Sequence, residues 1–228
     1  MQMKLRWPNT LAEFSPAAIR RMVLLALASL ASGLFIKLTW ELKEDVALSR
    51  IDESLLAFIG KLRWQPLNGP AVDVTAMGSA TLVFIFGLTG VLVLWLARDR
   101  KGAAFLISSV AGAGVWSSMI KFLVRRERPT VIERLVEVSN FSYLSGHTIL
   151  STALFLALAL LASRYFKDWR VRLAVFSMAF LLIGLVGFSR LYLGVHYPSD
   201  VASGIFLGIA WTLGLAAIFF SSRGSSRA

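Results

Sequence analysis

Six apolar stretches of roughly membrane-spanning length constrain this chain more than any other feature. They cover residues 22–38, 74–97, 102–124, 147–165, 173–193 and 200–220, and a helix needs about 20 apolar residues to cross the hydrocarbon core of a bilayer. With 57% hydrophobic and only 16% charged residues, the chain is too apolar for an ordinary soluble domain. The sequence therefore predicts an all-α fold, an integral membrane six-helix bundle.

The length and the charge of the chain narrow its organisation and its partners. At 228 residues there is room for one domain, so residues 1–228 are expected to form a single membrane-embedded unit. The net charge is +11, and because most Lys and Arg residues flank the apolar stretches, the membrane surface is a simpler partner than nucleic acid. The absence of Cys excludes disulfides and thiol chemistry. Nothing in the sequence sets the oligomeric state.

The segment between the first two stretches, residues 47–64, has a different pattern. Apolar residues recur there at helical spacing, with charged residues on the other face. The apolar set is Leu48, Ile51, Leu55, Phe58, Ile59 and Leu62, and the charged set is Asp52, Glu53, Lys61 and Arg63. The pattern predicts an interfacial amphipathic helix, either a helix that packs on the bundle or a lid or ramp for lipid entry.

The distribution of positive charge predicts the orientation. Lys and Arg are concentrated at the N-terminus, in the second and fourth loops and in the tail, and such segments face the cytoplasm. The first stretch is followed by acidic residues and not by a small-residue cleavage site, so we interpret it as a retained span. The chain is thus predicted to be a multi-pass protein of the plasma (inner) membrane with cytoplasmic N- and C-termini.

Three short polar clusters interrupt the apolar sequence within residues 121–200. They are Lys121 with Arg128-Pro129, then Ser145-Gly146-His147, then Ser189-Arg190 with His196 and Asp200. In the six-span plan the third and fifth spans end, and the fourth and sixth begin, on the non-cytoplasmic side. All three clusters should therefore meet on the outer, periplasmic face. Polar groups near a membrane interior are costly and point to function.

These motifs resemble the type 2 phosphatidic acid phosphatase family, whose pattern is Lys, six residues, Arg-Pro; then Pro-Ser-Gly-His; then Ser-Arg, five residues, His, three residues, Asp. This chain has Lys121-Phe-Leu-Val-Arg-Arg-Glu-Arg128-Pro129, Leu144-Ser-Gly-His147 and Ser189-Arg-Leu-Tyr-Leu-Gly-Val-His196-Tyr-Pro-Ser-Asp200. The resemblance is specific from Lys121 to Asp200 and loose upstream. Leu144 stands where the family usually has Pro, which predicts a looser loop before the fourth span.

The resemblance implies a catalytic role for three residues. His196 would attack phosphorus and form a phosphohistidine. His147 would be the general acid that protonates the leaving oxygen and later activates water. Asp200, about one helical turn beyond His196, would orient and stabilise the imidazole. The alternatives are a structural His and, for Asp200, an acid that complements a helix N-terminus.

Phosphate binding is expected from five further residues. Arg128 and Arg190 carry planar donor forks, and Lys121 adds a compact charge. Ser145 and Gly146 would begin a helix whose free N–H groups favour an anion. The alternatives are basic helix ends that contact lipid headgroups and, for Ser145, a plain N-cap. Arg125 and Arg126 would either extend the basic rim toward a second phosphate or face lipid.

Metal ligands are not expected, because Mg²⁺ and Ca²⁺ sites generally use several carboxylates and the clusters contain few. No cofactor is expected either. The predicted function is metal-independent hydrolysis of a terminal phosphate from a membrane lipid phosphate or diphosphate. Candidate substrates are undecaprenyl diphosphate, phosphatidylglycerophosphate, phosphatidic acid and a phosphorylated glycolipid. The alternatives are a non-catalytic protein that binds or transports lipid headgroups and a purely structural membrane subunit.

Overall fold

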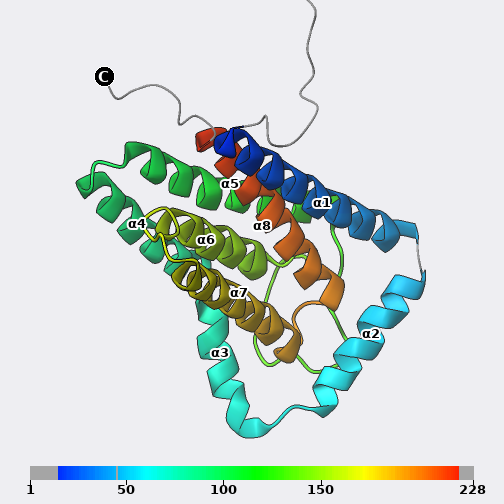
Figure 1. Cartoon of the computed structure of the whole chain (residues 1–228). Coiled ribbons are helices and arrows are strands. Elements are labelled where there is room, and N and C mark those ends of the chain that lie inside the picture. The colour runs from blue at the N-terminus through cyan, green and yellow to red at the C-terminus, as the bar shows by residue number, and fades with distance from the viewer. Residues whose placement is uncertain (1–14, 45, 221–228) are drawn as a thin grey trace, which may run out of the picture.

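The computed structural model describes residues 15–44 and 46–220. Within these residues the secondary structure is entirely helical, as predicted, with eight α-helices and one 3₁₀ helix (Figure 1). Their bounds are α1 Pro16–Glu44, α2 Val46–Lys61, η2 Gln65–Leu67, α3 Asn68–Ala76, α4 Ala80–Leu96, α5 Arg100–Val124, α6 Gly146–Ala162, α7 Trp169–Tyr192 and α8 Pro198–Phe219.

Among the described residues, four helices, α1, α5, α7 and α8, are long and apolar enough to cross a membrane. The predicted span over residues 74–97 is not one straight helix, because the chain breaks between α3 and α4 and the two segments meet at 46°. The break lies at Met77–Ser79, where the Ser79 hydroxyl accepts from the Leu82 N–H and starts α4 as an N-cap. If the bent pair α3 and α4 is counted as one span, the described residues contain five candidate spans. The predicted span over residues 147–165 corresponds to α6, which has 17 residues, so the count of six stays a prediction.

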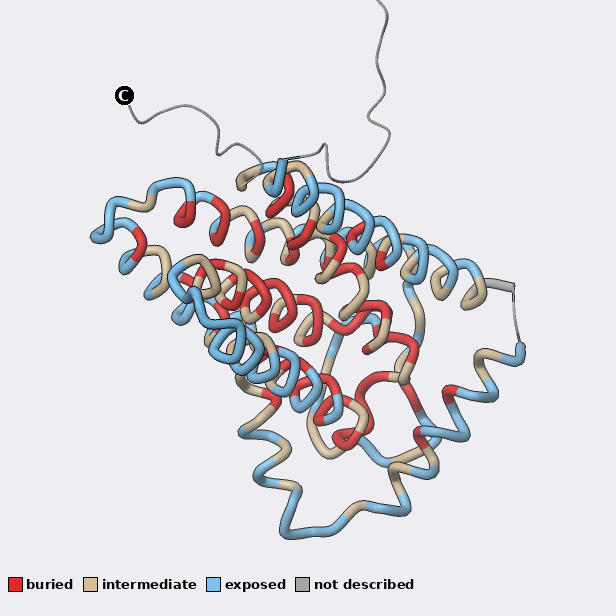
Figure 2. The backbone as a smooth tube through the Cα atoms, viewed as in Figure 1, coloured by how far each residue is buried: buried red, intermediate tan, exposed pale blue. Residues whose placement is uncertain are grey.

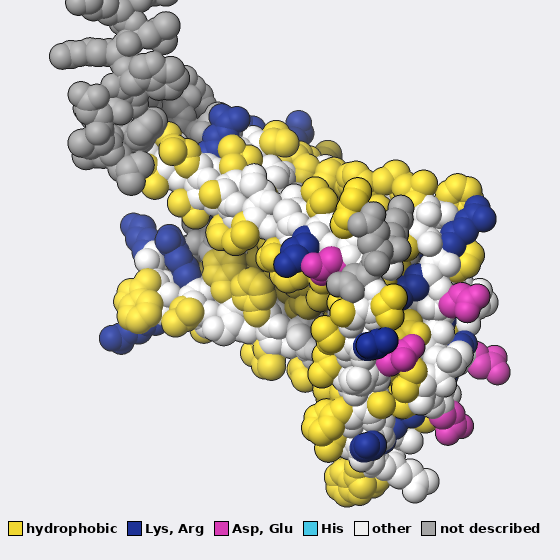
Figure 3. Space-filling view, turned by 90° about the vertical axis from the view of Figure 1, so that its right-hand side faces the viewer, with side chains coloured by type: hydrophobic (Ala, Val, Ile, Leu, Met, Phe, Trp, Pro, Cys, Tyr) yellow, Lys and Arg dark blue, Asp and Glu magenta, His cyan; other side chains and the backbone are white. Residues whose placement is uncertain are grey.

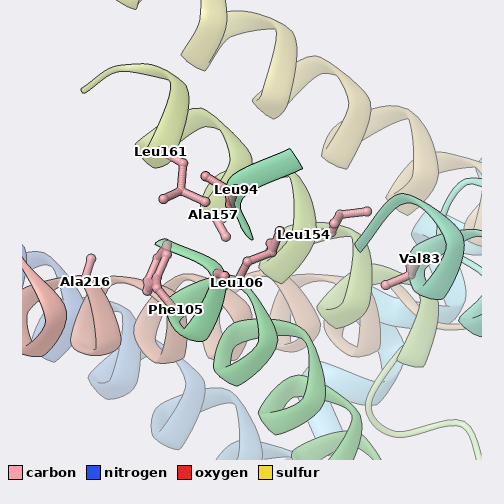
Figure 4. Packing of buried hydrophobic residues seen from close by; sticks show 9 residues of the cluster. Val83, Leu94, Phe105, Leu106, Leu154, Ala157, Leu161 and Ala216 are labelled. Carbon is pink, nitrogen blue, oxygen red and sulfur yellow. The ribbon is translucent and has the colours of Figure 1, made fainter. Parts of the chain in front are cut away.

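Helices α6 and α8 form the centre of the bundle, with most of their residues buried (Figure 2). Helix α8 packs against α1, α5 and α6, and α6 also contacts α7. An apolar cluster between α4, α5, α6 and α8 includes the fully buried Phe105, Leu106 and Leu154 (Figure 4). Gly208 lets α6 and α8 approach closely, because a Cβ there would lie 2.7 Å from the Cβ of Thr152. Small residues have this role wherever helices pack tightly in lipid.

The two ends of the bundle differ. The start of α1 lies beside the end of α8, where the Arg20 guanidinium donates to the Phe220 carbonyl at 2.5 Å. The chain termini themselves lie outside the described residues. The long loop between α5 and α6 and the short turn between α7 and α8 lie together at the other end, near α2 (Figure 1). The polar clusters of the sequence are at this second end.

A helix, α2, covers most of residues 47–64, but its inward face is not apolar throughout, and the interfacial amphipathic helix stays a prediction. Asp52 and Leu56 are buried, whereas Ile51, Leu55 and Phe58 are exposed. Figure 3 shows hydrophobic side chains over much of this side of the molecule, and acidic side chains gathered toward the α2 end. Its position along a membrane surface stays a prediction.

Candidate active site

The polar end of the bundle is built from helix ends and two connections. Lys121 lies in the last turn of α5, which ends at Arg125 in the left-handed conformation with φ of 51°. Arg190 lies in the last turn of α7, and Asp200 lies in the first turn of α8. The loop between α5 and α6 supplies the remaining groups. These positions restrict the side chains, because the backbone of each residue is held by the hydrogen bonds of its helix.

His196 and Asp200 form a buried pair. The imidazole is 1% exposed and the carboxylate is fully buried. Nδ1 of His196 lies 3.5 Å from Oδ2 of Asp200 and 3.4 Å from the Ser142 hydroxyl oxygen. Nε2, on the other side of the ring, lies 3.4 Å from Nη1 of Arg128. A proton on Nδ1 that faces the carboxylate would leave the lone pair on Nε2 directed toward Arg128.

The protonation of His196 follows from its surroundings. Burial is the largest cause that lowers the pKa of His196; the Asp200 carboxylate raises it, the charges of Arg190 and Arg128 lower it, and the resulting pKa is about 4. The net effect is an imidazole that is neutral at pH 7. A neutral imidazole carries the lone pair that a nucleophile needs.

Loop carbonyls hold the cations in place. Arg128 donates from Nε to the Asn140 carbonyl at 2.6 Å, from Nη2 to the Asn140 side chain at 2.5 Å, and from Nη1 to the Val195 carbonyl at 2.6 Å. Lys121 Nζ donates to the Phe141 carbonyl at 2.7 Å. The two cations are therefore tied to one stretch of loop and face the same space.

Arg190 differs from the other cations. It is 3% exposed, and its Nη1 donates to the Thr75 hydroxyl of α3 at 2.9 Å. Its Nε is buried and has no acceptor among the residues that the structure describes. His147, at the start of α6, lies within electrostatic range of Arg190, His196, Lys121 and Arg128. The two histidines thus lie within one cluster that also holds Lys121, Arg128 and Arg190.

The start of α6 presents backbone donors to this cluster. Ser145 occupies the N-cap position, but its hydroxyl accepts from the Thr148 hydroxyl at 2.8 Å and does not cap a backbone N–H. In the described part of the chain, the N–H groups of residues 146–148 have no acceptor. The Ser145 N–H donates to the Asp200 carbonyl at 3.1 Å, which ties α6 to α8. Gly146 lies beside Lys121, since a Cβ there would lie 3.8 Å from its Cε.

The structure therefore brings all eight predicted site residues to one end of the bundle. It also corrects the expectation for Arg126, which neither faces lipid nor lies free on the rim. Its Nη1 donates to Oδ1 of Asp200 and its Nη2 to Oδ2 of Asp52, both at 2.7 Å. Arg125, the neighbouring residue, is exposed and stacks over the Phe122 ring.

Sequence reasoning gave no role in the site to Asp52, Asn140 and Ser142, and it did not find the pairing of Arg126 with two carboxylates. Ser142 donates to Oδ2 of Asp200 from within the loop. Leu144, where the resemblance expects Pro, is fully buried in an apolar cluster with Ala113, Tyr143, Ile149, Ala153 and Leu207. Leu144 therefore packs against the bundle, and the looser loop stays a prediction.

The arrangement suits an anion better than a metal ion. Three cations and the N–H groups of a helix start face one region, and such groups bind phosphate. Among the described residues, no group of three or more His, Asp or Glu side chains is placed to hold a metal.

Known proteins resemble this chain in sequence and in fold. The chain is 31% identical over 165 residues to a lipid A 1-phosphatase of Rhizobium johnstonii, which covers 64% of this chain and 62% of the relative. It is 26% identical over 166 residues to phosphatidylglycerophosphatase B of Bacillus subtilis, and the match covers 72% of this chain and 80% of that relative. The chain thus spans less than two thirds of the first relative.

A crystal structure of a transmembrane PAP2 type phosphatidylglycerolphosphate phosphatase from Bacillus subtilis superposes with a TM-score of 0.78. The superposition covers 84% of this chain and 94% of that chain at 21% identity, so it shows a shared fold. Residues 102–223, more than half of the chain and all of the polar clusters, match the PAP2 superfamily. The protein is a multi-pass membrane protein and belongs to the PAP2 superfamily.

Proposed function

We propose that this protein hydrolyses the terminal phosphate of a membrane lipid phosphate or diphosphate. The observation that carries the proposal is the placement of His196, with Nδ1 beside the Asp200 carboxylate and Nε2 beside Arg128. A nucleophile whose reactive nitrogen faces a phosphate-binding cation is what phosphoryl transfer needs. The names of the relatives above, which designate phosphate removal from lipids, support the same reaction class.

The reaction has two steps. In the first, Nε2 of His196 attacks phosphorus in line, the N–P bond forms, and the bond from phosphorus to the lipid oxygen breaks. His147 gives its proton to that oxygen, and Asp200 stabilises the positive charge that develops on the imidazole. In the second, His147 takes a proton from water, the water oxygen attacks phosphorus, and the N–P bond breaks to release phosphate.

Side chains supply the charge neutralisation that many phosphatases obtain from metal ions. Lys121, Arg128 and Arg190, with the N–H groups at the start of α6 near Ser145 and Gly146, would bind the non-bridging oxygens. These donors are fixed before substrate arrives, because the loop and helix contacts already hold Arg128 and Lys121. The proposed hydrolysis is therefore independent of divalent metal.

The proposed location is the outer face of the inner membrane, with both termini in the cytoplasm. Support comes from the opposite placement of the polar cluster and of the Arg20–Phe220 end of the bundle, together with the positive charge near the termini. A lipid could reach the site laterally from the outer leaflet. Undecaprenyl diphosphate, phosphatidylglycerophosphate, phosphatidic acid and phosphorylated glycolipids all present the required phosphate.

The test is phosphate release by purified protein in detergent, over this panel of lipids, with EDTA present. We expect release by the wild type and by Arg125→Ala, the control on the exposed side of the same loop, and loss of release in His196→Ala. Release that needs added metal or survives loss of His196 would refute the mechanism. If the protein binds vesicles or micelles that contain the lipid phosphate but releases no inorganic phosphate, the headgroup-binding alternative would be favoured.

A further inference from the structure

A buried ionic network links helix α2 to the nucleophile pair. Asp52 is 1% exposed although its neighbours on α2, Ile51 and Glu53, are exposed. Its Oδ1 accepts from the Ser199 N–H at 2.9 Å, and its Oδ2 accepts from the Ser199 hydroxyl at 2.5 Å and from Arg126 at 2.7 Å. A carboxylate is rarely buried unless it is paired, so these contacts account for its position.

Arg126 bridges two carboxylates that come from different helices. One nitrogen of its planar fork binds Asp52 and the other binds Oδ1 of Asp200. The guanidinium lies 3.9 Å over the Tyr197 ring, and its Nη1 also donates to the Ser199 hydroxyl at 2.8 Å. Lys could not reproduce this bridge, because an ammonium is a point charge without a fork.

The bridge determines how Asp200 meets His196. Because Arg126 takes Oδ1, the Asp200 carboxylate cannot rotate freely, and Oδ2 faces Ser142, the Tyr197 N–H and Nδ1 of His196. Asp52 also offsets part of the positive charge of Arg126. The electrostatic potential that Asp200 produces at the His196 imidazole therefore stays negative. Without Asp52, Arg126 would neutralise Asp200 more completely.

We propose that Asp52 and Arg126 are positioning residues for the nucleophile, through which the docking of α2 sets the orientation of Asp200 and thereby of His196. The proposal rests on the proposed function only in naming His196 as the nucleophile. Asp52 and Arg126 contact each other and Ser199, and Arg126 also contacts Asp200 and Tyr197, but neither residue has a hydrogen bond with His196. Their effect should therefore fall on the rate of the chemical step and little on substrate binding.

The kinetic test compares Asp52→Asn with Glu53→Gln, which makes the same change of charge at the adjacent exposed residue. We expect Asp52→Asn to lower kcat about 10- to 100-fold with KM within about twofold, because a small misplacement of reacting groups has effects of this size. Glu53→Gln should match the wild type. Arg126→Lys should lose kcat to a similar extent, with Arg125→Lys as its control. The double variant of Asp52 and Arg126 should lose no more than the worse single variant, because the two residues act as a unit.

A second readout does not depend on activity. The chain has two histidines, so ¹⁵N NMR of labelled protein resolves His196 once His147→Gln assigns the spectrum. The charged groups around His196 are Asp200, Arg128 and Arg190, with His147 nearby. Removing the Asp52 charge should lower the pKa of His196 by about half a unit or more, because the net potential at the ring becomes more positive. Glu53→Gln should leave it unchanged.

The outcomes separate this proposal from the proposed function. Wild-type kcat and an unchanged His196 resonance in Asp52→Asn would overturn the positioning role while hydrolysis stands. A lowered melting temperature with full kcat would also overturn it, since Asp52 would then only dock α2. If the wild type released no phosphate but Asp52→Asn still shifted the His196 titration, hydrolysis would fail and the positioning role would stand. If Asp52→Asn does not fold, Arg126→Lys decides between these outcomes.

Discussion

Oδ2 of Asp200 lies 3.5 Å from Nδ1 of His196, four positions earlier in the chain, and Oδ1 of the same carboxylate is held by Arg126. The pair spans the start of α8, where the Tyr197 N–H also donates to Oδ2 at 2.9 Å. The same carboxylate therefore caps the helix and faces the imidazole. A helix N-terminus favours the ionised form of such an acid, which is the form that can stabilise a positive imidazole.

Asp200→Asn tests this relationship. The amide keeps the shape of the side chain but loses the charge that favours the Nδ1–H tautomer. We expect kcat for phosphate release to fall by roughly 10⁴-fold, as when the orienting carboxylate of a catalytic His is replaced by an amide. The Tyr197→Phe variant, which keeps the backbone donor, serves as the control. Retention of kcat in folded Asp200→Asn would contradict the role given to Asp200.

The buried setting of His196 predicts how stability depends on pH. The pKa of His196 is lowered from 6.5 to about 4, so between these values the unfolded chain binds more protons than the folded chain. Stability from this group is complete above pH 6.5 and is lost as the pH falls toward 4. Between pH 7 and pH 5 we expect a loss of about 2 kcal/mol that is missing in His196→Gln.

Thermal unfolding in detergent at the two pH values measures this difference. The melting temperature of the wild type should fall more than that of His196→Gln when the pH is lowered. Equal falls in the two proteins would mean that His196 titrates at an ordinary value in the folded state.

Local sequence patterns predicted the helices well but could not set how each helix is turned. The apolar residues of α5, α7 and α8 lie within single helices close to the predicted bounds. On α2, the apolar residues Ile51, Leu55 and Phe58 are exposed and Asp52 faces the protein. In a membrane protein, lipid can cover apolar side chains as well as a protein core can. Hydrophobic periodicity therefore does not reveal which face of α2 contacts the bundle.

Long-range pairing is the other part of the site that the sequence could not reveal. Arg126 is 74 residues from both Asp52 and Asp200, and nothing in the local sequence distinguishes it from the exposed Arg125. The break between α3 and α4 had a visible signal in Gly78-Ser79. Hydropathy averaged over about 20 residues does not reveal such a pair.

A substitution at Gly78 tests the role of the break between α3 and α4, because Gly78 lies against the backbone of His147. A Cβ at Gly78 would come within 2.6 Å of Cγ1 of Val186 and 2.8 Å of the His147 carbonyl oxygen. We expect Gly78→Ala to push α6 or α7 aside, to destabilise the protein by about 1–3 kcal/mol as overpacking does, and to lower kcat. Gly69→Ala on α3, where a Cβ meets nothing within 4 Å, should preserve both. Thermal unfolding and phosphate release measure the two effects, and wild-type behaviour of Gly78→Ala would show that the His147 backbone can yield without consequence.

From the buried Nε of Arg190, unpaired among the described residues, we predict that a tetrahedral oxyanion stabilises the folded protein. Its Nε is a buried donor without an acceptor in the described chain, and leaving such a group unpaired costs about 1–3 kcal/mol. An oxyanion that accepts from it removes this cost. Inorganic vanadate at about 100 times its Kd should therefore raise stability by about 2.7 kcal/mol in the wild type, seen as a higher melting temperature, and by clearly less in Arg190→Gln. Arg170→Gln, at the exposed opposite end of α7, should respond like the wild type. An equal response in Arg190→Gln would place the anion away from Arg190, and with it the phosphate of the proposed substrate.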